Sequence, residues 1–169
     1  MKRFLPYIIV LAFLFVVAAC STKKNTAATR FYHSFTARYN TYFNGHEAYK
    51  TGVLSQETGH LDNFTETLPV FIVSNKATAN IGKSNFDVTI TKCEKAIKNH
   101  SIKRKPKMSN TRRRTAKQKR ILAKKEYNPF LKNAWMLMGK AQFRKGEFIE
   151  AASTFSYITR LYAAEPDVL

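Results

Sequence analysis

The segment that most constrains the fold lies in the last quarter of the chain, where small and large apolar residues follow one another in a narrow order. Six residues carry this order: Trp135, Gly139, Ala141, Gly146, Ala151 and Phe155. Gly139 and Ala151 allow two helices to approach closely, and a glycine such as Gly146 suits the turn between them. The order is narrower than amphipathicity alone requires, so it predicts an antiparallel pair of helices over residues 128–163.

This segment resembles a tetratricopeptide repeat, in which Trp, Leu-Gly and Tyr stand on the first helix and Ala and Phe on the second. Asn128-Pro129 supplies an N-cap and a first-turn proline, which sets the start of the pair. The closing proline is Pro166, about three residues later than the 34-residue repeat would place it. A generic helical hairpin is the alternative. Since no polar capping helix follows, we expect an all-α fold that is the front of an open solenoid.

The first twenty residues have the features of a secretory signal peptide, with a basic start and an uncharged run from Phe4 to Ala19. That run is too short for the roughly 30 Å hydrocarbon core, although a retained membrane anchor is the alternative. Val17-Ala18-Ala19-Cys20 resembles the bacterial lipobox. We therefore predict residues 1–20 as a signal peptide and Cys20 as the lipidated N-terminus, with residues 21–28 as a tether.

The resemblance to lipoprotein sorting signals implies the periplasmic face of the outer membrane, because no aspartate follows Cys20 and no acidic cluster lies nearby. Lipidation of Cys20 leaves Cys93 without an intramolecular partner, so no disulfide is expected.

Residues 29–102 are expected to form an N-terminal helical region. Aromatic residues recur there at spacings of three and four, which predicts the buried stripe of an amphipathic helix: Phe31, Phe35, Tyr39, Tyr42 and Phe43. Asn44-Gly45 should end this helix, and a second helix from His46 would complete an αα-hairpin. Residues 55–86 are expected to be an irregular connection or a short helix. A third helix is predicted over residues 87–100, with Cys93 as a buried, inert thiol.

Residues 103–125 form a basic linker that contains twelve lysines and arginines and no acidic residue, in a chain of net charge +18. A cytosolic protein with such a run would be a candidate for nucleic-acid binding, but the signal peptide removes that partner. Anionic lipid head groups or an acidic protein surface are then the expected partners, with Arg112, Arg113 and Arg114 as contacts. A solvated spacer is the alternative. Thr115 onward should be helical.

No enzyme is indicated. The four histidines lack the spacing of a zinc peptidase, and the six glycines fall singly at turns instead of forming a phosphate-binding loop. The eleven acidic residues provide no pair suited to acid/base catalysis. We expect no metal, no cofactor and no catalytic residue.

Several segments together resemble one family: residues 38–45, residues 92–102, the basic spacer, and residues 127–135 around Tyr127-Asn128-Pro129-Phe130. They are similar to the N-terminal part of the SprE/PorW family of Bacteroidetes, which are tetratricopeptide-repeat lipoproteins of type IX secretion and gliding motility. The resemblance implies an outer-membrane-anchored periplasmic scaffold that contacts other secretion proteins. The alternative is a periplasmic repeat adaptor for outer-membrane protein assembly.

Overall fold

The computed structural model describes residues 22, 24–65, 67–68, 72, 78, 80–108 and 113–165, and the regular structure within them is entirely helical. The elements are α2 (Ala27–Thr36), the π-helix η1 (Ala37–Tyr42), α3 (Phe43–Gly59), α4 (Lys83–His100), α5 (Ala116–Ala123), α6 (Leu131–Lys145) and α7 (Phe148–Leu161). The predicted all-α class is confirmed.

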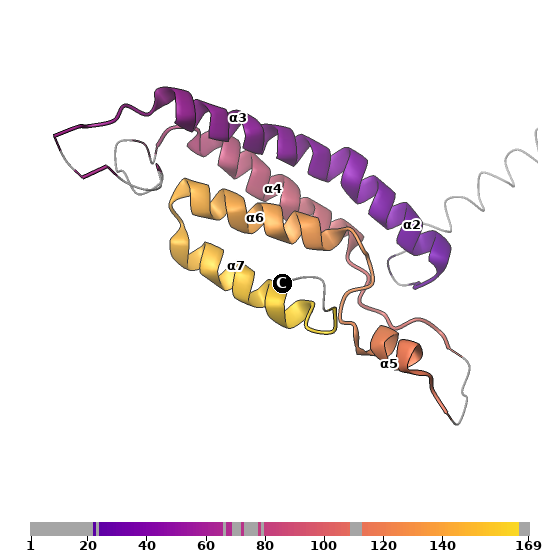
Figure 1. Ribbon diagram of the computed structural model, residues 1–169. Helices are drawn as coiled ribbons and strands as arrows, with labels where there is room; N and C mark the ends of the chain where they lie inside the picture. The colour runs from indigo at the N-terminus through magenta and orange to yellow at the C-terminus, as the bar shows by residue number, and fades with distance from the viewer. Residues whose placement is uncertain are drawn as a thin grey trace, which may run out of the picture.

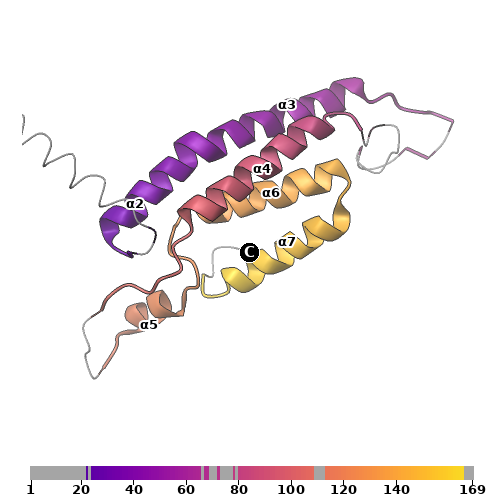
Figure 2. The same ribbon diagram turned by 180° about the vertical axis from the view of Figure 1, so that it is seen from behind.

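The helices form an open stack in which each one packs on the next. Figures 1 and 2 show α2, η1 and α3 as one long rod, with α4, α6 and α7 beside it in that order and α5 standing apart. The extensive contacts join α3 to α4, α4 to α6, and α6 to α7. Helix α4 is therefore covered on two sides, and Cys93 and Ala96 on it are fully buried.

The predicted turn at Asn44-Gly45 is wrong. The chain continues in helical conformation from α2 through η1 into α3, and the antiparallel partner of this rod is α4. Gly45 serves a different purpose, because a Cβ atom built on it would lie 3.1 Å from Cβ of Lys92 on α4. The hydroxyl of Thr89 donates a hydrogen bond to the carbonyl oxygen of Gly45 over 3.0 Å. The glycine allows two backbones to approach closely and does not end the helix.

Two further glycines continue this contact along α3 at intervals of seven residues. A Cβ atom on Gly52 would lie 2.9 Å from Cε1 of Phe86, and one on Gly59 would lie 3.1 Å from Cδ1 of Ile81. Phe86 is fully buried by this arrangement. A heptad interval returns to nearly the same face of a helix, so the three glycines form one groove that receives α4 and, at Gly59, the residue Ile81 that precedes it.

The predicted burial of the aromatic stripe is also wrong. The residues of α2 and η1 that face the core are small or polar, namely Thr29, His33, Ala37 and Thr41. Phe31, Phe35, Tyr39 and Phe43 lie on the outside of the rod, whereas Tyr42 is partly buried against the core. Because small and polar residues bring α2 and η1 close to the core, the large rings of these two elements do not fit on that side.

A buried pair of histidines joins α2 to the end of α4. Nδ1 of His33 and Nδ1 of His100 are 3.0 Å apart, which requires one neutral ring to donate and the other to accept. Burial lowers the pKa of His33; burial and the neighbouring His33 lower that of His100. Nε2 of His33 is buried without a hydrogen-bond partner among the described residues. The contact is therefore built for uncharged rings.

The segment between α3 and α4 is irregular where the structure describes it, as predicted for much of residues 55–86. The apolar run beginning at Pro69 lies mostly outside the described residues. Helix α4 begins four residues earlier than predicted, after Gly82, whose φ is +72°. A side chain at Gly82 would meet the carbonyl oxygen of Gly52 at 2.6 Å, so only glycine fits this turn.

The predicted C-terminal pair is confirmed as α6 and α7. Gly146 ends α6 with a φ of +87°. A Cβ atom on Gly139 would lie 2.7 Å from Cε1 of Phe155, and the rings of Trp135 and Tyr157 are 4.8 Å apart. Large rings of α7 thus pack on α6. Phe148, at the start of α7, remains 48% exposed.

Asn128 caps the turn that leads into α6. Its Oδ1 accepts a hydrogen bond from the backbone N–H of Phe130 over 3.0 Å, although the regular helix begins only at Leu131. Pro166, the expected closing proline, lies outside the described residues.

The basic linker contains one helix, α5, which begins where it was predicted to begin. The hydroxyl of Thr115 accepts from the backbone N–H of Gln118, and the Gln118 side chain accepts in return from the N–H of Thr115. This capping box starts a helix that buries none of its residues.

Candidate functional site

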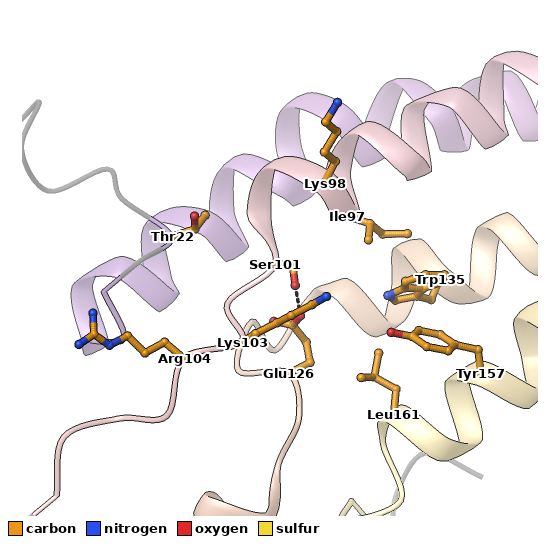
Figure 3. Close-up of a pocket in the computed structure, with 10 residues that line it drawn as sticks. All are labelled: Thr22, Ile97, Lys98, Ser101, Lys103, Arg104, Glu126, Trp135, Tyr157 and Leu161. Atoms are coloured by element: carbon orange, nitrogen blue, oxygen red, sulfur yellow. Dashed lines mark hydrogen bonds between the residues drawn. The ribbon is translucent and has the colours of Figure 1, made fainter.

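A cavity of about 390 Å³ opens where the basic linker leaves the helical stack. Figure 3 shows it between the end of α4, the first turns of α6 and the second half of α7. Its lining comes from four segments that are distant in sequence: Thr22, Ile97, Lys98, Ser101, Lys103, Arg104, Glu126, Trp135, Tyr157 and Leu161. The cavity therefore forms where the helical pair of α3 and α4 packs on the helical pair of α6 and α7.

Glu126 closes the base of the cavity. Its side chain is buried, and its Oε1 accepts hydrogen bonds from the backbone N–H groups of Ile102, Tyr127 and Asn128 at 2.8, 3.0 and 2.8 Å. Its Oε2 accepts the hydroxyl of Ser101 over 2.5 Å, the dashed line in Figure 3. We call Glu126 with these four donors the carboxylate clamp. Charge-assisted hydrogen bonds of this kind are about twice as strong as neutral ones.

The clamp pins both ends of the basic linker to each other. The N–H of Tyr127 donates to the carbonyl oxygen of Ile102 over 3.0 Å, and the Asn128 amide donates to the carbonyl oxygen of His100 over 2.9 Å. Both oxygens of the Glu126 carboxylate thus accept hydrogen bonds, and all four donors belong to the chain itself. The carboxylate holds the linker and is not positioned to move protons for a bound substrate.

Burial, followed by the charge of Glu126, raises the pKa of Tyr162 far above its ordinary value. Its hydroxyl is buried without a hydrogen-bond partner among the described residues. Tyr162 therefore remains neutral beneath the clamp.

Apolar and cationic groups occupy different parts of the cavity. Trp135 and Tyr157 lie against each other on one wall, with Leu161 below them in Figure 3. Lys98 and Lys103 are exposed; in Figure 3 the Lys103 side chain extends toward Trp135, whereas the Lys98 ammonium points away from the cavity. Such a combination suits a partner segment that carries both an apolar side chain and a carboxylate.

The predicted anionic-partner contacts are not part of this cavity. Arg113 and Arg114 are exposed, and within the described part of the chain no hydrogen bond or ion pair engages their guanidinium groups. Arg112 and the predicted lipidation site, Cys20, lie outside the described residues.

Among the six repeat residues, Gly139 and Phe155 lie in contact across the pair, and Gly146 forms its turn. Trp135 alone also lines the cavity. Ala141 and Ala151 are buried in the stack. Cys93 is buried as predicted, and burial, followed by the charge of Glu94, raises the pKa of its thiol to about 12.

Glu126 and Ser101 were missed by reasoning from the sequence. The one signal for Glu126 is that it is the first acidic residue after the acid-free run of residues 103–125. Its partners are backbone amides, which no sequence pattern identifies.

Among the described residues, no three histidine, cysteine or acidic side chains gather closely enough to hold a metal ion. No described helix combines the length and the apolar character needed to cross a membrane. Neither a protein-family model nor a curated protein matches the chain.

Proposed function

We propose that this chain is a lipid-anchored helical scaffold that acts through protein contacts at the periplasmic face of the outer membrane. The observation that carries the proposal is the open stack of α3, α4, α6 and α7, in which each helix packs on the next. Stacks of helical pairs expose extended surfaces to partners, and that is their usual role.

The cavity beside the clamp supports a peptide-binding role for this scaffold. Trp135 and Tyr157 offer aromatic surface, and aromatic residues are enriched where proteins bind one another. Lys98 and Lys103 add positive charge at its margin. The partner segment that fits best carries an apolar side chain next to an acidic group.

The resemblance of residues 38–45, 92–102 and 127–135 to the SprE/PorW family connects this scaffold to type IX secretion and gliding motility. In this proposal the lipid on Cys20 holds the stack at the membrane, and partners of the secretion machinery bind it from the periplasm. The chain would act by contact, without catalysis.

The test is affinity purification of the tagged chain from membranes, with bound proteins identified by mass spectrometry. We expect secretion-machinery proteins to copurify, and the double variant Trp135→Ala/Lys103→Glu to lose them. Lys117→Glu, on the exposed helix α5, is the control for a charge reversal outside the cavity. Enrichment of outer-membrane assembly factors instead would replace this proposal with the adaptor function. Cys20→Ala should abolish labelling by radioactive palmitate, and normal labelling would overturn the anchor.

A further inference from the structure

The outer face of the long rod carries an aromatic stripe, defined as Phe31, Phe35, Tyr39 and Phe43. These side chains are 72%, 54%, 57% and 54% exposed. The rings of Phe31 and Phe35 are 6.0 Å apart, and those of Phe35 and Tyr39 are 4.7 Å apart. Exposed apolar surface of this continuity is uncommon on a protein that meets only water, and it marks a binding surface.

The π-helix η1 keeps this stripe straight. Residues four apart drift around a regular α-helix in one direction, because a turn contains 3.6 residues. A π turn contains more residues, so the same interval drifts in the other direction there. The N–H of Phe43 bonds to the carbonyl oxygen of Arg38, five residues back. The two drifts offset each other, and the four rings lie along one side of the rod.

A basic pocket lies at the start of the stripe. Its volume is about 660 Å³, and its lining contains five cationic residues and no acidic one: Lys24, Arg30, Arg104, Lys105 and Lys107. Asn25 builds this pocket, because its Oδ1 accepts from Nη1 of Arg30 over 2.6 Å and its Nδ2 donates to the carbonyl oxygen of Arg104 over 2.5 Å. The tether and the first residues of the basic linker are thereby joined.

Arg30 belongs to both features. It lines the basic pocket, and it also lines a shallow groove of about 410 Å³ that follows the stripe past Phe35 and Arg38. The guanidinium of Arg38 lies 5.2 Å from the centre of the Tyr39 ring. Cations and aromatic rings therefore share one surface, and residues 21–46 contain no acidic residue at all.

We propose that this surface docks on a bilayer of anionic phospholipid, with the aromatic stripe in the interface and a lipid phosphate in the basic pocket. A helix with aromatic residues beside cations is the pattern of a segment that lies in the plane of a membrane. The orientation rests on the proposed anchor at Cys20: Phe31 is the eleventh residue after it, a reach of at most about 40 Å. The stack would then stand on the membrane in one orientation.

The stripe is tested by depth measurement in nanodiscs made from brominated phosphatidylglycerol and phosphatidylcholine, using the chain extracted from membranes. The variants are Phe35→Trp and, as the matched control, Phe148→Trp, because Phe148 is an aromatic of similar exposure on α7. The wild type, whose single tryptophan is Trp135, gives the background. We expect quenching and a blue shift at residue 35 and neither at residue 148. Equal quenching at both positions, or none at residue 35, would overturn the proposal.

The basic pocket is tested with two variants that lose the same charge. Arg30→Gln/Lys105→Gln/Lys107→Gln removes three cations of the pocket, and Lys117→Gln/Lys119→Gln/Arg120→Gln removes three from α5. Each cation near an anionic surface favours docking about fivefold. We expect the first variant to lose the quenching of a tryptophan at residue 35 in anionic nanodiscs, and the second to retain it.

Equal losses of quenching in the two variants would mean that net charge alone attracts the chain to the bilayer. That result would overturn the proposal that the basic pocket binds a lipid phosphate. Undiminished quenching in the first variant would overturn it as well. The mass of the extracted chain reports lipidation separately. If the chain is lipidated but a tryptophan at residue 35 is not quenched, the docking surface is rejected and the lipid anchor is retained. If the tryptophan is quenched but the chain is not lipidated, the anchor is rejected and the docking surface is retained.

Discussion

The C-terminal helical pair places aromatic rings inside its contact, whereas the first part of the rod, α2 and η1, leaves them outside. In the C-terminal pair, the Phe155 ring of α7 fits against Gly139 on α6, so a large side chain faces a small one across the contact. In the N-terminal pair, α2 and η1 turn small and polar residues toward the core and leave four aromatic rings outside. Apolar periodicity therefore identifies a face of a helix without deciding whether that face is buried.

The positions of the small residues decide which face of the helix is buried. Gly45, Gly52 and Gly59 follow one another at intervals of seven; the first two meet α4, and Gly59 meets Ile81 just before it. A face of small residues allows close backbone approach, whereas the aromatic face would hold the two helices apart. The difference teaches that glycine spacing within a helix is a better guide to the contact than the spacing of rings.

The largest expected effect is the difference in stability between a variant that loses a buried ring and a variant that loses an exposed one. Phe86→Ala should lower the free energy of unfolding by about 3 to 5 kcal/mol, because it opens a cavity between α3 and α4. Phe35→Ala should change it by less than about 0.5 kcal/mol, because the ring lies on the surface. Urea unfolding followed by far-ultraviolet circular dichroism measures both. A Phe35→Ala loss as large as that of Phe86→Ala would contradict the outward orientation of the stripe.

The next largest effect is the difference in stability between alanine variants at the turn glycines of the two helical pairs, Gly82 and Gly146. Gly82→Ala combines a left-handed conformation, which costs about 1 to 2 kcal/mol, with a clash against the Gly52 backbone that costs about 1 to 3 kcal/mol. Gly146→Ala should carry only the first cost, because nothing lies within 4 Å of the added carbon. The same unfolding measurement compares them. If the two variants are equally stable, the close approach at Gly82 is absent in solution.

The smallest effect concerns the His33–His100 pair, which joins α2 to the end of α4. Both pKa values lie below the ordinary 6.5 in the folded chain, so the unfolded chain binds protons first as the pH falls. The pair's contribution to stability is complete above pH 6.5 and is lost as the pH drops below it toward the lowered values.

Unfolding midpoints at pH 7.5 and 5.5 test this expectation against the double variant His33→Gln/His100→Gln, which preserves hydrogen bonding without titrating. We expect the wild type to lose more stability than the variant between the two pH values. The same loss in both chains would mean that the pair does not titrate as an uncharged unit.

These contrasts also mark how far the sequence predicts the structure. Local patterns succeeded: α5 begins directly after Thr115, and Gly139 lies at the contact between the two C-terminal helices. The prediction at Asn44-Gly45 failed because a glycine serves a turn or a close contact equally well, and only the partner helix decides between them. The sequence predicted the residues of the candidate site less well than it predicted the helices. Trp135 was recognised as a repeat residue, but Glu126 binds the backbone amides of Tyr127, Asn128 and the distant Ile102, and such contacts leave no trace in residue types.

The carboxylate clamp has a consequence for how much change the molecule tolerates between Ile102 and Glu126. The two ends of that segment meet at a fixed point, and the entropy cost of closing a loop rises by only about 0.6 kcal/mol for each doubling of its length. Additional sequence placed near Arg113, beyond the basic pocket, would therefore extend outward while the helices keep their positions. This makes the segment a natural insertion point, at which a reporter domain or a lineage-specific extension can be accommodated without redesign of the helical stack.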